Sequence, residues 1–228
     1  MPTSVREFIP NQIFVGLPWR NVRKHYEKII PNLHKKYPLY FTIVGWNDSQ
    51  HATDLFEVIK ARITQSSHGI FDATGGNANV SLEYGYAEGV GIPRAIFLST
   101  HGATRRGASN PIISDLVGSR RVQYKTQKGL VKELQKFSRE HPYSIRFEKA
   151  LSLILRGMNK GQKKSGRALA LKIIHKIDGA SEVRREDILQ QLAAEEYRQT
   201  WIEFFLKRLH STGVINCSVG AKSKVRVA

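Results

Sequence analysis

Apolar and polar positions along the first 140 residues follow two alternating spacings. Short apolar runs predict strands, and segments with apolar residues three or four positions apart predict helices between them. This alternation predicts an α/β domain with a parallel, five-stranded, flavodoxin-like sheet. The expected strands are Gln12–Val15, Tyr40–Gly45, His68–Phe71, Arg94–Leu98 and Val122–Tyr124, and the expected helices are Asn21–Tyr37, Asp54–Gln65, Ser81–Gly89 and Lys128–Arg139.

Proline and glycine positions refine these predictions. Pro31 lies inside the first helical pattern and should kink or shorten that helix, which Pro38 ends. The first strand is followed by Gly16-Leu17-Pro18-Trp19 and by no GxGxxG motif, so a dinucleotide-binding Rossmann site is not supported.

The pattern changes after His141-Pro142. Arg156–Gly166 is a basic, glycine-containing stretch, and beyond it three helical patterns precede two strand-like runs, an order typical of a winged helix-turn-helix. The sequence thus predicts a sheet domain over residues 1–142, a basic helical connector over 143–166 and a winged helix-turn-helix over 167–228. The expected C-terminal helices are Tyr143–Leu155, Arg167–Ile177, Arg185–Ala193 and Tyr197–Ser211, and the expected strands are Val214–Val219 and Lys224–Val227.

Positive charge is concentrated in the middle of the chain. The net charge is +17, of which residues 105–167 supply +12, from 16 Lys and Arg against 4 Asp and Glu. Residues 1–104 supply +2 and residues 168–228 supply +3. A basic tract of this kind favours nucleic acid or another polyanion through counterion release. The alternative is a solvated linker that only aids solubility.

The remaining composition excludes several classes of protein. Cys217 is the only cysteine, so disulfide frameworks and cysteine-based metal sites within one chain are excluded. The eight histidines show no ligand spacing, and we expect neither a metal nor a cofactor. The N-terminus has no signal-peptide pattern and no apolar run is long enough to span a membrane, so we expect a cytoplasmic location without membrane partners.

The stretch Asp72–Ala87, DATGGNANVSLEYGYA, holds the candidate chemistry. Asp72 ends a short apolar run, a loop of small polar residues follows, and we expect Glu83 on the first turn of the next helix. In open parallel sheets, ligands bind at the carboxyl ends of the strands. A carboxylate aimed there at an anomeric carbon is what cleavage of a glycosidic bond requires.

The run FDATGGNANVSLEYGYAEGVGIPRAIFL resembles the signature of the nucleoside 2-deoxyribosyltransferase-like and bacterial TIR-like families. The segments FVGLPW and ISDLVGSRRVQYKTQKGLVKEL are also similar to this superfamily, so the resemblance spans about residues 11–140. It implies a flavodoxin-like fold and hydrolysis or transfer at the N-glycosidic bond of a nucleoside, nucleotide or NAD. Several prokaryotic anti-phage systems, including some retrons, pair such domains with nucleic-acid-binding modules, so the resemblance also implies a defence effector.

By this resemblance Glu83 matches the catalytic glutamate, as nucleophile or as electrostatic stabiliser of the transition state. Asp72 matches the strand-end aspartate that hydrogen-bonds a ribose hydroxyl or the base. Each also has a structural interpretation, since Glu83 would complement a helix N-terminus and Asp72 would cap or brace the loop. The candidate substrate-binding residues are Asn77 and Asn79 for sugar or phosphate, Gly16, Leu17 and Pro18 along the neighbouring strand end, Trp19 and Trp46 for stacking on a base or for packing, and Asp48 as the one candidate second carboxylate.

The basic residues supply the candidate nucleic-acid contacts. Lys222, Lys224 and Arg226 alternate along one strand and should share a face. Winged helices also dock proteins, so a nucleoprotein or protein partner is an alternative. The other candidates are Arg105, Arg106, Arg120, Arg121, Lys160, Lys163, Lys164, Arg167, Arg198, Lys207 and Arg208.

Three hypotheses follow from the sequence. The first is an N-glycosidase-type effector whose C-terminal module binds nucleic acid or a nucleoprotein. The second is a non-enzymatic regulator that senses a nucleotide and binds DNA, and the third is a scaffold subunit with an inactive pocket. The intact set Asp72, Asn79 and Glu83 ranks the enzyme first, and the oligomeric state, a homo-oligomer included, is left open.

Overall fold

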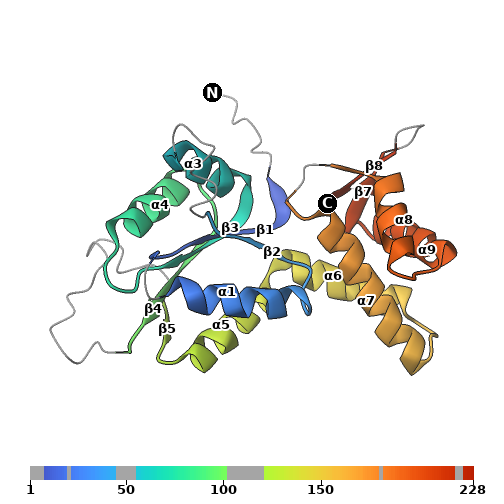
Figure 1. Ribbon diagram of the computed structural model, residues 1–228, viewed down its shortest axis with the longest axis horizontal. Helices are drawn as coiled ribbons and strands as arrows, with labels where there is room; N and C mark the ends of the chain where they lie inside the picture. Colours follow the sequence, from blue (N-terminus) through green and yellow to red (C-terminus); the bar gives the residue numbers. More distant parts are fainter. Residues whose placement is uncertain (1–7, 20–21, 45–54, 102–120, 180–181, 219–222) are drawn as a thin grey trace. The chain divides into compact units, whose positions relative to one another are not determined.

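A computed structural model describes residues 8–19, 22–44, 55–101, 121–179, 182–218 and 223–228 of the chain (Figure 1). These residues form two compact units. The sheet unit comprises described residues of 1–32 and 41–137, and the helical unit comprises residues 33–40 and described residues of 138–228. Within the described ranges, no helix combines the length and the apolar character needed to cross a membrane.

The sheet unit is built on a five-stranded sheet. Its neighbouring strands β1 and β3, β3 and β4, and β4 and β5 pair in parallel, and the order β2-β1-β3-β4-β5 is flavodoxin-like, which confirms the predicted fold class. The central strands are buried along most of their length because helices cover both faces. The strands are β1 (Ile9–Gly16), β2 (Tyr40–Thr42), β3 (Ser66–Asp72), β4 (Arg94–Ser99) and β5 (Arg121–Tyr124).

Two pairs of helices cover the two faces. α3 (Leu55–Gln65) and α4 (Ala78–Gly89) lie on one face, and α1 (Arg23–His34) and α5 (Gln127–Glu140) lie on the other (Figure 1). Ring contacts agree with this arrangement, since Tyr84 of α4 meets Phe71 edge-on at 5.5 Å and Phe137 of α5 meets His68 at 6.1 Å. Phe71 and His68 differ by an odd number of positions along β3, so they point to opposite faces.

Two helix boundaries differ from the sequence prediction. α4 begins at Ala78, three residues earlier than expected, because the Asn77 side chain accepts hydrogen bonds from the amides of Asn79 and Val80. Glu83 therefore lies on the second turn of α4, and the expected position on the first turn was wrong. α1 retains Pro31 in its last turn and ends at His34, three residues before the expected end.

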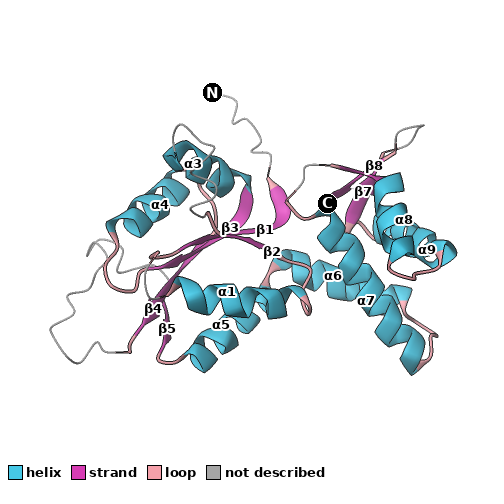
Figure 2. Cartoon of the chain, viewed as in Figure 1, coloured by secondary structure: helices cyan, strands magenta, loops and turns pink. Residues whose placement is uncertain are grey.

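The helical unit contains four helices and a small antiparallel sheet among its described residues (Figure 2). The sheet has the order β6-β8-β7. Strand β6 has only two residues, too few for an alternating pattern to predict it. The elements are α6 (Pro142–Ile154), α7 (Lys160–Ile177), β6 (Val183–Arg184), α8 (Arg185–Ala194), α9 (Gln199–Ser211), β7 (Ile215–Cys217) and β8 (Lys224–Val227).

Within the expected helical connector over residues 143–166, residues 143–154 belong to α6 and residues 160–166 form the start of α7. α7 opens with a capping box, in which Asn159 and Gln162 satisfy each other's backbone amides. Gly166 is buried in this helix, and a Cβ there would lie 2.7 Å from Phe205 of α9 and 2.8 Å from Leu155. The glycine thus permits close helix packing within the helical unit and does not loosen a linker.

Candidate functional site

Glu83 projects from α4 onto the carboxyl end of β1. The nearest atom to a Cβ built on Gly16, the last residue of β1, would be Oε2 of Glu83, so the carboxyl group lies directly over the glycine. Oε2 is buried and has no hydrogen-bond partner among the described residues. Burial raises the pKa of Glu83 to about 7.

The local sequence fixes this position. Val80, Tyr84 and Ala87 recur at helical spacing and form the buried face of α4. Glu83 precedes Tyr84, so it lies at the edge of that face and stays in contact with the sheet. Gly75 and Gly76 of the loop before α4 have φ angles of 81° and 66°, which only glycine adopts without strain. This loop brings the start of α4 back over the strand ends.

The arrangement favours a chemical over a structural role for Glu83. The favourable interaction between an acid and a helix N-terminus falls off within the first turn, and Glu83 is on the second. A buried oxygen without a partner costs stability, typically about 1–3 kcal/mol, and such an atom calls for an explanation. A carboxyl group with a pKa near neutrality at a strand end is equipped to act as a base, nucleophile or electrostatic stabiliser.

Asp72 lies on the opposite face of the sheet from Glu83. Phe71 points toward α4, so the next residue of β3 points toward α1. Asp72 is fully buried, and its Oδ2 accepts hydrogen bonds from the hydroxyls of Tyr26 at 2.9 Å and Tyr124 at 2.7 Å. The two expected catalytic carboxylates therefore lie on opposite faces of the sheet, and the hydrogen bonds of Asp72 favour the bracing role that was its alternative.

The Asp72 network supports the loop before α4. Oδ1 of Asp72 accepts from the amide of Thr74 at 3.0 Å, and the Thr74 hydroxyl accepts from the amide of Ser99 at 2.8 Å. Burial, and then the neighbouring Asp72, raise the pKa of Tyr26 and Tyr124, so both phenols remain donors. Sequence reasoning missed these two tyrosines because both occupy apolar positions of a helix or strand, where tyrosine is expected for packing alone.

The expected substrate-binding residues differ in how exposed they are. Leu17 and Pro18 are buried, whereas Trp19 is 42 % exposed and has the Arg23 guanidinium 5.3 Å from its ring centroid. Asn79 is exposed one turn before Glu83, so the two side chains share a face of α4. Asn77 caps α4 through its side-chain oxygen Oδ1, so a ligand could still bind the side-chain nitrogen Nδ2. Trp46 and Asp48 lie outside the described residues.

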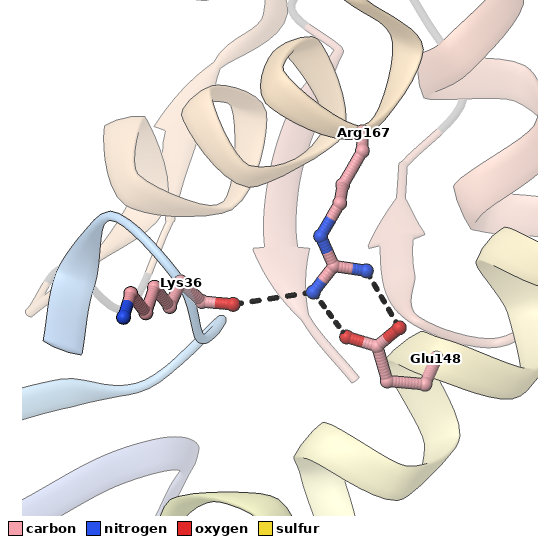
Figure 3. Close-up of polar contacts among 3 residues, drawn as sticks. All are labelled: Lys36, Glu148 and Arg167. Carbon is pink, nitrogen blue, oxygen red and sulfur yellow. Dashed lines mark hydrogen bonds and ion pairs between the residues drawn. The ribbon is translucent and has the colours of Figure 1, made fainter. Parts of the chain in front are cut away.

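The candidate basic residues fall on both units. Arg121 is half-buried at the amino end of β5 in the sheet unit. In the helical unit, Arg167 donates two hydrogen bonds to Glu148, at 2.5 and 2.6 Å, so it is engaged within the protein (Figure 3). Lys224 pairs with Glu182 at 2.6 Å. Lys160, Lys163, Lys164, Arg198, Lys207, Arg208 and Arg226 are exposed, whereas Arg105, Arg106, Arg120 and Lys222 lie outside the described residues.

The β8 side chains follow the predicted alternation. Lys224 and Arg226 are exposed and Val225 and Val227 are buried, so the two cations share the outer face of the small sheet. On α9, the guanidinium of Arg208 lies 5.5 Å from the ring centroid of the exposed Phe204.

Comparisons with known proteins give distant similarity to solved structures alone. No protein-family model matches the chain, and no curated protein matches it. Among solved structures, a CMP N-glycosidase from Clostridium botulinum is similar, with a TM-score of 0.37 and 12 % identity over 55 % of this chain and 98 % of that chain. A similarity this distant leaves the function of this chain to be argued from the geometry of its own residues.

Proposed function

We propose that the sheet unit cleaves the N-glycosidic bond of a nucleotide, nucleoside or NAD, with Glu83 acting at the anomeric carbon. The observation that supports this is the buried, unpartnered Oε2 of Glu83 over Gly16, at the edge of a parallel sheet where ligands bind. The absence of a side chain at Gly16 lets the Glu83 carboxyl group lie over this strand end, where a Cβ would overlap it. The positive charge that develops on the sugar carbon during cleavage would interact favourably with this oxygen.

The chemistry requires the ionised form of Glu83. As the C1′–N bond breaks, the bonding electron pair leaves with the base and C1′ becomes oxocarbenium-like. The base of a nucleoside or nucleotide takes up a proton as it leaves, whereas the nicotinamide of NAD, which starts as a cation, leaves neutral and needs none. The carboxylate either bonds to C1′ or stabilises its charge until water adds there and loses a proton. Asp48, the sequence candidate for protonating the base, lies outside the described residues. In a defence effector, as the family resemblance implies, this reaction would deplete a nucleotide pool.

The test is a product assay across pH. The full-length protein is incubated with ribo- and deoxyribonucleosides, their 5′-phosphates and NAD, and free base is separated chromatographically. Because the pKa of Glu83 is raised to about 7, turnover of the accepted substrate should rise with pH, with its half-maximum near that value. A Glu83→Gln protein purified in parallel measures contaminating activity. Substrate binding without any product would instead favour the nucleotide-sensing regulator.

The second part of the proposal concerns the helical unit, which we assign to nucleic-acid binding through a winged helix-turn-helix. The order α7, β6, α8, α9, β7, β8 supports this assignment, because a winged helix has the same succession of helices and strands. Exposed cations lie at the start of α7, on α9 and on the outer face of β8. The first turn of α7 contains no acid. Such side chains contact phosphates, which gives affinity for nucleic acid but does not distinguish one base sequence from another.

Salt dependence tests this assignment. Replacing Lys160, Lys163 and Lys164 by glutamine should weaken binding to duplex DNA and lower the slope of log K against log salt by about one per lysine removed. The matched control replaces Lys128, Lys132 and Lys136, three exposed lysines of α5 in the sheet unit. An equal loss of slope in both triple variants would show diffuse attraction to a basic protein and would remove the α7 surface from the proposal.

A further inference from the structure

The segment that joins α1 to β2 is held by two side chains of α7. Residues 33–40 belong to the helical unit. Arg167 donates a hydrogen bond from Nη2 to the carbonyl oxygen of Lys36 at 3.2 Å, and Nε2 of His175 lies 2.7 Å from the carbonyl oxygen of His34 (Figure 3 shows the first of these). An acid orients each cation: Glu148 holds Arg167 and Asp178 holds His175.

The two partners of His175 determine its protonation. A backbone carbonyl only accepts hydrogen bonds, so Nε2 must carry a hydrogen to bond His34 O. Nδ1 lies 2.5 Å from Oδ2 of Asp178, whose side chain is 7 % exposed. An ionised carboxylate also only accepts, so Nδ1 must carry the second hydrogen. The geometry thus requires an imidazolium at His175 if Asp178 is ionised.

The carbonyl that His175 meets is at a helix end. His34 is the last residue of α1, and the last carbonyls of a helix have no intrahelical partners and carry partial negative charge. Cations are therefore favoured at this point, and the sequence places both Arg167 and His175 there. Neither contact could be foreseen locally, because 131 and 141 positions separate the paired residues.

We propose that His175 is a proton-dependent clamp, which in its doubly protonated form fixes the C-terminus of α1 to α7 and releases it when it loses the Nε2 proton. Arg167, which keeps its charge at all relevant pH values, is the permanent half of the attachment. This device acts independently of the chemistry proposed for Glu83.

A second histidine limits the clamp on the acidic side. The ring of His34 stacks on that of His175, with centroids 5.4 Å apart, and on that of Tyr40 at 6.1 Å. Two imidazolium ions at this separation repel each other, so the stacked pair carries a single positive charge. Burial, and then the charge of His175, lower the pKa of His34.

Other charged and titratable groups lie near the two histidines. Tyr143 of α6, which feels the charge of Asp178, donates its hydroxyl to the carbonyl of Val214 and stays neutral because burial raises its pKa. Arg146 lies over the Tyr143 ring. On α7 itself, Lys172 and Lys176 both pair with Glu195. Asp178 is thus the acid that compensates the charge of His175.

The direction of the pH effect follows from these shifts. Burial alone lowers the pKa of His175, but the hydrogen bond and charge of Asp178 outweigh it and the pKa is raised. Stabilisation from His175 is therefore complete below the ordinary histidine value of about 6.5 and is lost as the pH rises through its folded pKa. The lowered pKa of His34 has the opposite effect, so its contribution is lost as the pH falls. The clamp is strongest between the two values.

Imidazole nitrogen NMR on the wild-type full chain tests the proposal directly. At pH 6.5 both ring nitrogens of His175 should be protonated, while His34 should show one protonated nitrogen. A single neutral tautomer at His175 at this pH would overturn the proposal. This measurement does not depend on the folding of any variant.

Amide exchange then tests the release. The amides of Lys36 and Tyr37 both donate to the carbonyl of Leu33, so they report on this segment. After correction for intrinsic rates, their exchange should be about tenfold faster once the pH exceeds the His175 pKa by one unit. His175→Gln should remove this pH dependence, Arg167→Gln should speed exchange equally at every pH, and the exposed control His25→Gln should match wild type. A pH dependence that survives in His175→Gln would assign the effect to another group.

Discussion

Replacing Glu83 by glutamine should abolish glycosidic cleavage and at the same time stabilise the protein. Glutamine keeps the shape but cannot bond to C1′ or balance its charge, so turnover should fall by roughly a hundredfold to ten-thousandfold. The raised pKa of the buried carboxyl group means that removing its ionised form from water makes the free energy of folding less favourable. A pKa of about 7 corresponds to a cost of roughly 3 kcal/mol once the group is ionised, and glutamine avoids it.

The pH dependence separates this effect from ordinary repacking. The cost is absent below the pKa of the unfolded carboxyl, near 4.5, grows as the pH rises, and is complete above about 7. Unfolding curves of wild type and Glu83→Gln should therefore coincide at pH 4.5 and diverge above neutrality, with the variant more stable. Glu57→Gln on α3 is the matched control, because its side chain is 64 % exposed and should change neither property appreciably. A variant that loses stability at pH 8 would place Glu83 among the structural residues.

The strands and their order could be predicted because both depend on local signals. Each strand is a short apolar run bounded by Gly, Pro or polar residues, and right-handed crossovers leave few ways to arrange five such runs. The same pattern indicated the loop after β3 as the candidate site, since parallel strands end at one edge of the sheet. Glu83 was found in this way, although the cap at Asn77 moved it from the first turn of its helix to the second.

The position of Asp72 shows where local reasoning ends. The sequence placed Asp72 and Glu83 at the same edge of the sheet, and that is where they are. Strand alternation puts Phe71 and Asp72 on opposite faces, but only the tertiary fold shows that α4 covers the Phe71 side. The hydroxyl groups of Tyr26 and Tyr124 donate hydrogen bonds to Asp72, and these residues are 46 and 52 positions away from it in the sequence. No pattern within a helix or strand indicates such a contact.

Gly16→Ala should lower the proposed glycosidic cleavage about a hundredfold, although Gly16 has no side chain of its own. The new Cβ would overlap Oε2 of Glu83 and would lie 2.8 Å from Cδ1 of Phe71. Phe71 is held by Phe14 and Tyr84, so the carboxyl group is the part that must move. A displacement of about 1 Å from the reacting carbon can cost about a hundredfold in rate, and overpacking a core typically costs about 1–3 kcal/mol. Free-base release and thermal unfolding of the same preparation measure both losses.

Gly85→Ala, on the helix that bears Glu83, should have the opposite effect to Gly16→Ala. Gly85 is exposed in α4, and a Cβ there meets no described atom within 4 Å. Alanine in place of glycine in a helix interior should stabilise the protein by up to about 1 kcal/mol and leave turnover unchanged. The two substitutions add the same methyl group, so a difference between them isolates the space over β1. If Gly16→Ala retained full turnover, the substrate would not need Glu83 where it lies, and the catalytic assignment would have to move to another side chain at this edge of the sheet.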